Sequence, residues 1–381
     1  MPRAISISLL VKSQDAPIMS TMDQSIGLRV AQALPSGISQ KEIAQQIGMT
    51  EDAFSRALRG QRGFSAIELA NLAEVLDADI HLLITGQPDP NRLVPSARHN
   101  FDPESRARTV EDAAGDQLVL SDVALAYRQA ASVVESVAST IPTDLASTVD
   151  ALGPSFVRCF IERLAVMGID VVRLSGLSTT YSLYFGDRAV IVLKETGNWF
   201  NENFGLAHEL GHLTLGHRGV LASEDQRVTS EEYAANAFAA ELLLPRDLMC
   251  SVGWSSISAA DLASFVWDRG ISTATLRNRL DNLGLAITAA TRALLSQTTQ
   301  RLLRHHWVAN ESGDPITDRM SSASARTFPT WLKDAHLDGI AAGRLQKHTL
   351  AWMLGVDADE LEVEEPEIEP VGADVLMDIL G

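Results

Sequence analysis

Apolar and polar residues alternate along this chain with different periods, and the changes of period divide it into segments. Between about Met22 and Gly86, apolar residues recur every three or four positions, and glycines separate the runs. That spacing is typical of short amphipathic helices. It predicts a compact bundle of four or five helices, and we assign residues 20–88 to this N-terminal domain.

Residues 86–117 hold four prolines and little apolar periodicity, and we interpret residues 89–117 as a linker. Helical spacing then returns over residues 119–139 and 155–167. These two segments predict the first helices of a second domain.

Three apolar segments with period 2 follow and predict strands over residues 171–174, 181–185 and 189–193. The turn residues at 186–188 join the second strand to the third as a hairpin. Two helices are expected next: one begins near Asn203, and one covers residues 230–244 and is ended by a proline.

Helical spacing continues over residues 258–284, 286–306 and 328–355. The complete pattern predicts an α+β fold that is mostly helical. After the bundle and the linker, its parts are a domain with a small twisted β-sheet over residues 118–255, a helical region over 256–355 and an acidic tail over 356–381.

The charge balance argues against a protein whose main task is binding nucleic acid. Lys and Arg number 31 and Asp and Glu number 49, so the net charge is −18. Phosphate binding requires a positive surface, which this composition does not favour. Residues 357–369 carry eight carboxylates and no cation, as expected of a solvated tail.

No apolar run approaches the ~18 residues needed to span a bilayer, and the N-terminus lacks the features of a signal peptide. Cys159 and Cys250 are far apart in sequence and belong to no CxxC pair. We expect both to be buried thiols in a cytoplasmic protein that does not contact membranes.

The strongest chemical signal is the pair His208 and His212, with Glu209 between them. Positions i and i+4 of a helix share one face, so both imidazoles can point at one ion. Glu209 lies about 100° round the helix, where its carboxylate can reach a water on a bound metal and accept a proton. A chance HExxH pattern is expected about once in a hundred such chains. The prediction is one zinc ion per chain, although other divalent metals fit the same ligands.

A catalytic zinc site needs a third protein ligand, and the next predicted helix offers Glu232 or its neighbour Glu231. Asn236, one turn after Glu232, is placed to orient a ligand through a hydrogen bond. His217 lies five residues after His212, off the shared face. We expect it to support the site rather than to bind the metal.

The segments FGLAHELGHLTLGH and EEYAANAFAAELLLP closely resemble the ImmA/IrrE family of metallopeptidases. The resemblance covers about residues 155–285 and implies a minimal zincin-like domain, a small twisted sheet beside the active-site helix. It also implies zinc ligation by His208, His212 and Glu232, with Glu209 as the catalytic base. Members of the family typically cleave a specific helix-turn-helix repressor. Asn203 departs from the family pattern, in which an Arg is common at that position.

Residues 39–59 fit a helix-turn-helix, with Gly48 at the turn and Thr50 as the cap of the second helix. Over about residues 22–86 the chain resembles the Cro/repressor-like (XRE) domain. If residues 39–62 bind DNA, the expected contacts come from side chains at the exposed end of this unit: Gln40, Ser55, Arg56 and Arg59. Glu51 and Asp52 would repel phosphates there, so a protein-binding or dimerising role, including a homodimer, stays open.

Residues 257–285 also have helix, turn and helix character, and they fit either a second DNA-reading unit with Arg277 and Arg279 exposed or a packing pair that supports the peptidase. The leading hypothesis is a zinc endopeptidase that regulates transcription by cleaving a repressor or another partner protein. A DNA-binding regulator with a sensor or structural metal site is the alternative, and an antitoxin-like protein is the third hypothesis.

Overall fold

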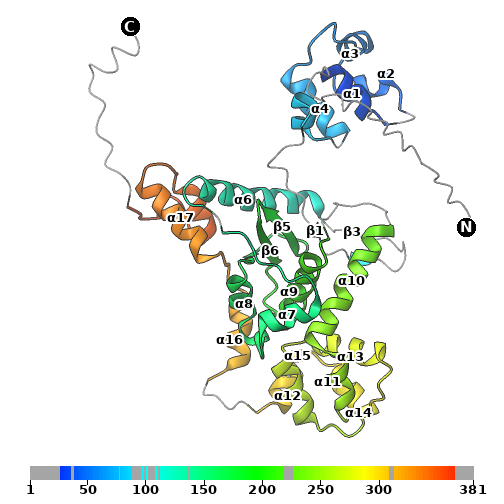
Figure 1. Ribbon diagram of the computed structural model, residues 1–381, viewed down its shortest axis with the longest axis vertical. Coiled ribbons are helices and arrows are strands. Elements are labelled where there is room, and N and C mark those ends of the chain that lie inside the picture. The colour runs from blue at the N-terminus through cyan, green and yellow to red at the C-terminus, as the bar shows by residue number, and fades with distance from the viewer. Residues whose placement is uncertain are drawn as a thin grey trace, which may run out of the picture. The chain divides into compact units, whose positions relative to one another are not determined.

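The computed structural model describes residues 26–35, 38–76, 78–87, 96–97, 100–101, 108–109, 112–135, 137–217, 226–308 and 313–364. Its contacts separate two compact units, with the boundary between Arg92 and Leu93 (Figure 1). The fold is α+β and mostly helical, as the sequence predicted.

The N-terminal unit contains five short helices. They are α1 (Ile26–Ala33), α2 (Gln40–Gln46), α3 (Glu51–Leu58), α4 (Ala66–Val75) and α5 (Ile80–Thr85). Gly48 has a φ of +75° at the turn before α3, and the Thr50 side chain accepts a hydrogen bond from the Ala53 amide, so both predicted roles are confirmed. Phe54 and Leu72 are fully buried at the centre of the bundle.

The second unit is built on a four-stranded sheet in the order β1-β5-β6-β4. Its strands are β1 (Ser96–Ala97), β4 (Asp170–Leu174), β5 (Tyr181–Phe185) and β6 (Arg188–Lys194). β5 and β6 form the predicted antiparallel hairpin, and β4 pairs with β6 in parallel. The strand β1 and a second ribbon, β2 (Asn100–Phe101) with β3 (Arg108–Thr109), fall within residues 89–117, where no strand was predicted. Two residues are too few to display a period of 2.

The helices of this unit follow in chain order. They are α6 (Ala113–Ala131), α7 (Leu145–Leu152), η2 (Phe156–Cys159), α8 (Phe160–Val166), α9 (Trp199–Thr214), α10 (Gln226–Leu243), α11 (Arg246–Ser251), α12 (Ala259–Arg269), α13 (Thr273–Asn282), α14 (Ala289–Leu295), α15 (Thr299–His306), α16 (Pro315–Ser322), α17 (Thr330–Ala341) and α18 (His348–Leu354). The helix, turn and helix predicted over residues 257–285 are present as α12 and α13, and Gly270, whose φ is +58°, ends α12.

Helices cover both faces of the sheet, which explains why β6 is apolar along nearly its whole length. Ile191 and Leu193 belong to the core that also contains buried side chains of α8, α9, α10 and α12. Val190 and Val192 belong to the core on the other face, which α6, α17 and α18 complete. Successive residues of a strand point to opposite faces, so a doubly covered strand has no polar side.

The structure also bears on the expected burial of the cysteines and on the absence of a membrane-spanning segment. Both cysteines were expected to be buried, but Cys250 is exposed and Cys159 is half-buried, because each lies on a helix surface rather than in the core. Within the described residues, no helix has both the length and the apolar character that a bilayer span requires.

Candidate metal centre

The helix α9 carries both histidines and is buried along most of its length. Its first turn is capped by Asn198, whose side chain accepts a hydrogen bond from the Asn201 amide at 3.3 Å. It crosses α10 closely at Gly211. A β-carbon there would lie 3.1 Å from Phe238 and 3.3 Å from the Cα of Ala235, so the absence of a side chain permits the close approach. This contact brings the carboxylate of α10 beside the imidazoles of α9.

His208, His212 and Glu232 form a compact group of potential metal ligands, and all three are buried. The two Nε2 atoms are 3.1 Å apart. The Glu232 carboxylate lies 3.2 Å from Nε2 of His212 and 3.5 Å from Nε2 of His208. Ligands at 2.0–2.1 Å from a tetrahedral zinc ion are separated by about 3.3 Å. The Glu232 oxygen near His208 is Oε2 and the one near His212 is Oε1, and one ligand atom from each of the three residues lies within 4.8 Å of the others, so the group can close on one ion.

Contacts behind the histidines determine how their rings are turned. Nδ1 of His208 lies 3.2 Å from Oδ1 of Asn236, and the Asn236 amide nitrogen donates to the Glu232 carbonyl at 2.8 Å. Nδ1 of His212 lies 3.1 Å from Nδ1 of His217. Both Nε2 atoms are thus left facing the Glu232 carboxylate. Hydrogen bonds at the second ring nitrogen are the usual means of orienting an imidazole ligand.

The electrostatics of the group favour a cation. Burial disfavours the protonated ring of His212, but the carboxylates of Glu232 and Glu209 outweigh this effect and raise the pKa of His212. Burial and the nearby His212 lower the pKa of His217, which favours its neutral form. Glu209 is fully buried one residue after His208. A buried concentration of carboxylates beside two imidazoles is stabilised by a divalent ion.

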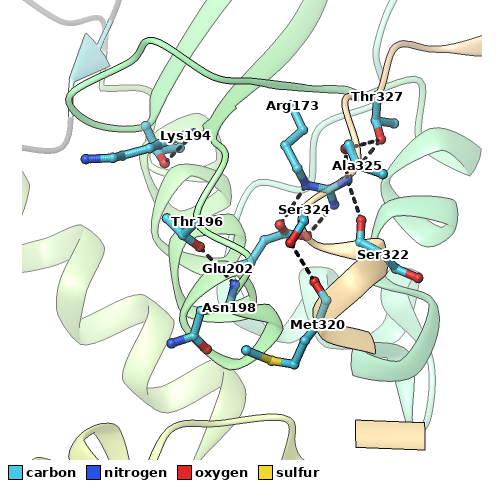
Figure 2. Close-up of polar contacts among 11 residues, drawn as sticks. Arg173, Lys194, Thr196, Asn198, Glu202, Met320, Ser322, Ser324, Ala325 and Thr327 are labelled. Carbon is cyan, nitrogen blue, oxygen red and sulfur yellow. Dashed lines mark hydrogen bonds and ion pairs between the residues drawn. The ribbon is translucent and has the colours of Figure 1, made fainter. Parts of the chain in front are cut away.

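The first turn of α9 is tied to the sheet by a buried ion pair that sequence reasoning missed. Arg173 of β4 donates two hydrogen bonds to the Glu202 carboxylate, at 2.8 and 2.6 Å (Figure 2). Its remaining nitrogen donates to the Ser322 and Ala325 carbonyls and to the Thr327 hydroxyl. The available signal was a single arginine within residues 171–174, which are otherwise apolar, since a buried arginine needs a partner for its charge.

Asn203 and the helix pair α12–α13 support α9 from another side. The Asn203 side chain donates to the Gly270 carbonyl at 2.8 Å, at the turn between α12 and α13. Arg279, one of two arginines considered exposed for DNA reading, is only 12% exposed in its side chain. It pairs with Glu241 and donates to the Leu244 carbonyl. The α13 helix therefore packs against α10.

The predicted DNA contacts lie on the N-terminal unit. Gln40 is the first residue of α2 and is exposed, and Ser55 is half-buried on α3. Arg56 is exposed 3.9 Å from the Asp52 carboxylate. The exposed Arg59 donates to the Ser55 hydroxyl at 3.2 Å. Asp52 and Glu51, both exposed, occupy the first turn of the same helix, so this face carries charges of both signs.

One family model matches this chain, that of the IrrE N-terminal-like domain of the M78 peptidases, over residues 164–280. The matched segment contains the strands β4 to β6, the helices α9 to α12 and most of α13. No curated protein and no solved structure matches the chain. The family match and the convergent group of ligands together support a metallopeptidase domain of the ImmA/IrrE type in the second unit.

Proposed function

We propose that this chain is a zinc-dependent endopeptidase that regulates transcription by cleaving a helix-turn-helix repressor or another specific partner protein. The observation that supports it most directly is the convergence of His208, His212 and Glu232, which each offer one ligand atom within 4.8 Å of the others. That arrangement suits one tetrahedral ion with an open fourth position. The family match over residues 164–280 supports the same class of reaction.

In this proposal His208, His212 and Glu232 hold the ion, which when bound supplies a Lewis acid for the scissile carbonyl. Glu209 is the general base. Its carboxylate takes a proton from the attacking water as the water oxygen bonds to the carbonyl carbon. It then gives that proton to the amide nitrogen as the C–N bond breaks. Asn236 and His217 keep the imidazoles turned toward the ion.

The test of this proposal is a comparison of wild-type protein with the variant Glu209→Gln. Both are incubated with helix-turn-helix repressors from the same genome, first of all any that a neighbouring gene encodes, with zinc or with a chelator, and products are identified by mass spectrometry. We expect the wild type to bind one zinc ion and to cut one of these repressors once. Glu209→Gln should retain the ion and lose a factor of about 10²–10⁴ in rate. Absence of stoichiometric metal from the purified wild-type protein would refute the proposal.

We further propose that the N-terminal unit locates the target by binding DNA through α2 and α3. Exposed Gln40 and Arg56 support this role, and the neighbouring Asp52 opposes it. Fluorescence anisotropy with a labelled duplex at low and high salt measures the interaction. Binding that weakens with salt and is lost in Arg56→Glu supports DNA recognition. No binding at low salt would leave the protein-binding alternative.

A further inference from the structure

A polar groove lies along the same helix faces as the candidate metal ligands. It is a cavity of about 600 Å³ between α9, α10 and α13, with the ends of the strand β6 and of the loop before β5 at its floor. Gly205 and Asn201 line it from α9, three and seven residues before His208. Asn236 and Ala240 line it from α10, four and eight residues after Glu232. Residues at these spacings share a helix face, so the groove leads away from the metal centre.

The α13 helix forms the outer wall of this groove. Its residues Asn278, Arg279 and Asn282 face the cavity, together with Thr275. Arg279 is one of the two arginines considered for DNA reading in residues 257–285, and here it lines the groove. The α13 helix therefore gives the groove a wall with two amide side chains, Asn278 and Asn282.

Charge in the groove is unbalanced in favour of cations. The carboxylate of Glu202 is buried and held by Arg173, and the guanidinium of Arg279 is paired with Glu241. Lys194, at the end of β6, is exposed and points away from the Arg173–Glu202 pair (Figure 2). Its ammonium group donates to the Ser178 carbonyl at 3.1 Å, and among the described residues it forms no ion pair. A positive groove is notable on a chain whose net charge is −18.

We propose that this groove, which we call the α9–α10–α13 groove, receives the part of the protein substrate next to the scissile bond and selects an acidic side chain there. The inference rests on the proposed peptidase function and extends it to the substrate class. The Lys194 ammonium pairs with the substrate carboxylate, because a charge pair in a partly enclosed groove discriminates between substrates by sign. The exposed amides of Asn201, Asn278 and Asn282 bind the polar backbone of the segment, since each offers a donor and an acceptor.

The groove has an unfilled position at its centre that allows a second, independent test. A β-carbon built on Gly205 would have the Thr180 hydroxyl, at 4.0 Å, as its nearest neighbour. Gly205→Ala should therefore fit without displacement. Gly205→Leu should project its side chain into the groove and obstruct it. Gly205 is not one of the candidate metal ligands, so both variants leave those ligands in place.

The experiment measures binding with the zinc-loaded full-length chain carrying Glu209→Gln, so that no probe is consumed. The probes are three pools of fluorescein-labelled dodecapeptides that differ only in a central pair of residues: Asp/Glu, Asn/Gln or Lys/Arg. Anisotropy should rank the acidic pool first, by about three- to tenfold over the amide pool. Lys194→Glu should reverse the ranking, and Lys41→Glu, an equal charge change on exposed α2, should leave it unchanged. Gly205→Leu should weaken all pools while retaining the metal.

The outcomes separate this inference from the proposed function. Preference for acidic peptides that depends on Lys194, without repressor cleavage by wild-type protein, would support acidic selection by the groove and refute both the repressor cleavage and the place of the groove beside a scissile bond. Cleavage by wild-type protein, with no preference among the pools or no effect of Lys194→Glu, would refute the groove alone. Equal binding by Gly205→Leu and Gly205→Ala would also overturn it.

Discussion

The ion pair between Arg173 and Glu202 should be a determinant of the stability of the metal-binding unit. Both side chains are buried, with 5% and 4% exposed, and Glu202 lies in the first turn of the helix that carries His208. Burial raises the pKa of Glu202 more than Arg173 lowers it, so desolvation exceeds the attraction. Replacing one partner leaves the other charge buried alone, which typically costs about 3–5 kcal/mol.

The loss of unfolding free energy expected when both partners are replaced can be worked out from the other hydrogen bonds of Arg173. Arg173→Met and Glu202→Met should each reduce the free energy of unfolding by about 3–5 kcal/mol. The double variant contains no buried charge at this position. It loses three hydrogen bonds, to Ser322, Ala325 and Thr327, at about 1 kcal/mol each. We therefore expect it to cost about 3 kcal/mol, well below the sum of the single variants.

Urea unfolding followed by tryptophan fluorescence measures these differences. All six tryptophans follow residue 198, so the signal reports on the second unit alone. The control is the pair Arg158 and Asp268 in the same unit, whose side chains are 53% and 58% exposed. Replacing either member of the control pair should cost less than about 1 kcal/mol. Additive effects of Arg173→Met and Glu202→Met would refute the reasoning.

Three further predictions concern the metal site, its helix and the C-terminal helices. Glu232→Ala should abolish stoichiometric zinc in elemental analysis while Glu231→Ala retains it; equal zinc in both would exclude Glu232 as a ligand. Gly205→Ala should raise the free energy of unfolding in urea by about 0.5–1 kcal/mol. Gly211→Ala should be less stable than Gly205→Ala because its β-carbon meets α10, and the opposite order would contradict the packing. His336 is fully buried, and burial lowers its pKa, so the neutral ring stabilises the fold above about pH 6.5 and this contribution is lost as the pH falls below that value. The melting temperature of wild type should therefore fall more between pH 7 and pH 5 than that of His336→Leu; parallel curves would contradict this.

Local patterns were sufficient for the elements whose residues repeat over several turns or strand positions. The hairpin β5–β6 and the predicted N-terminal bundle of short helices agree with the structure. The division of residues 258–284 at Gly270 was also visible as a turn signal. These features depend on neighbours in the chain, such as apolar spacing and caps, so the sequence alone contains them.

The site was predictable only as far as one helix extends. His208, Glu209 and His212 share a few residues of sequence, and helix geometry alone places both imidazoles on one face. The choice between Glu231 and Glu232 could not be made in this way. It depends on the rotation of α10 against α9, which the contact at Gly211 determines.

The sequence by itself determined that this chain has a helical bundle, a small apolar strand region and a helix bearing two imidazoles and a carboxylate, because each is encoded by residues a few positions apart. Only the tertiary structure decided which carboxylate meets the imidazoles, that Arg173 pairs with Glu202 across 29 positions, and that α13 lines a groove with α9 and α10. These contacts join segments far apart in the chain, and their geometry follows from how the buried faces of helices and sheet pack.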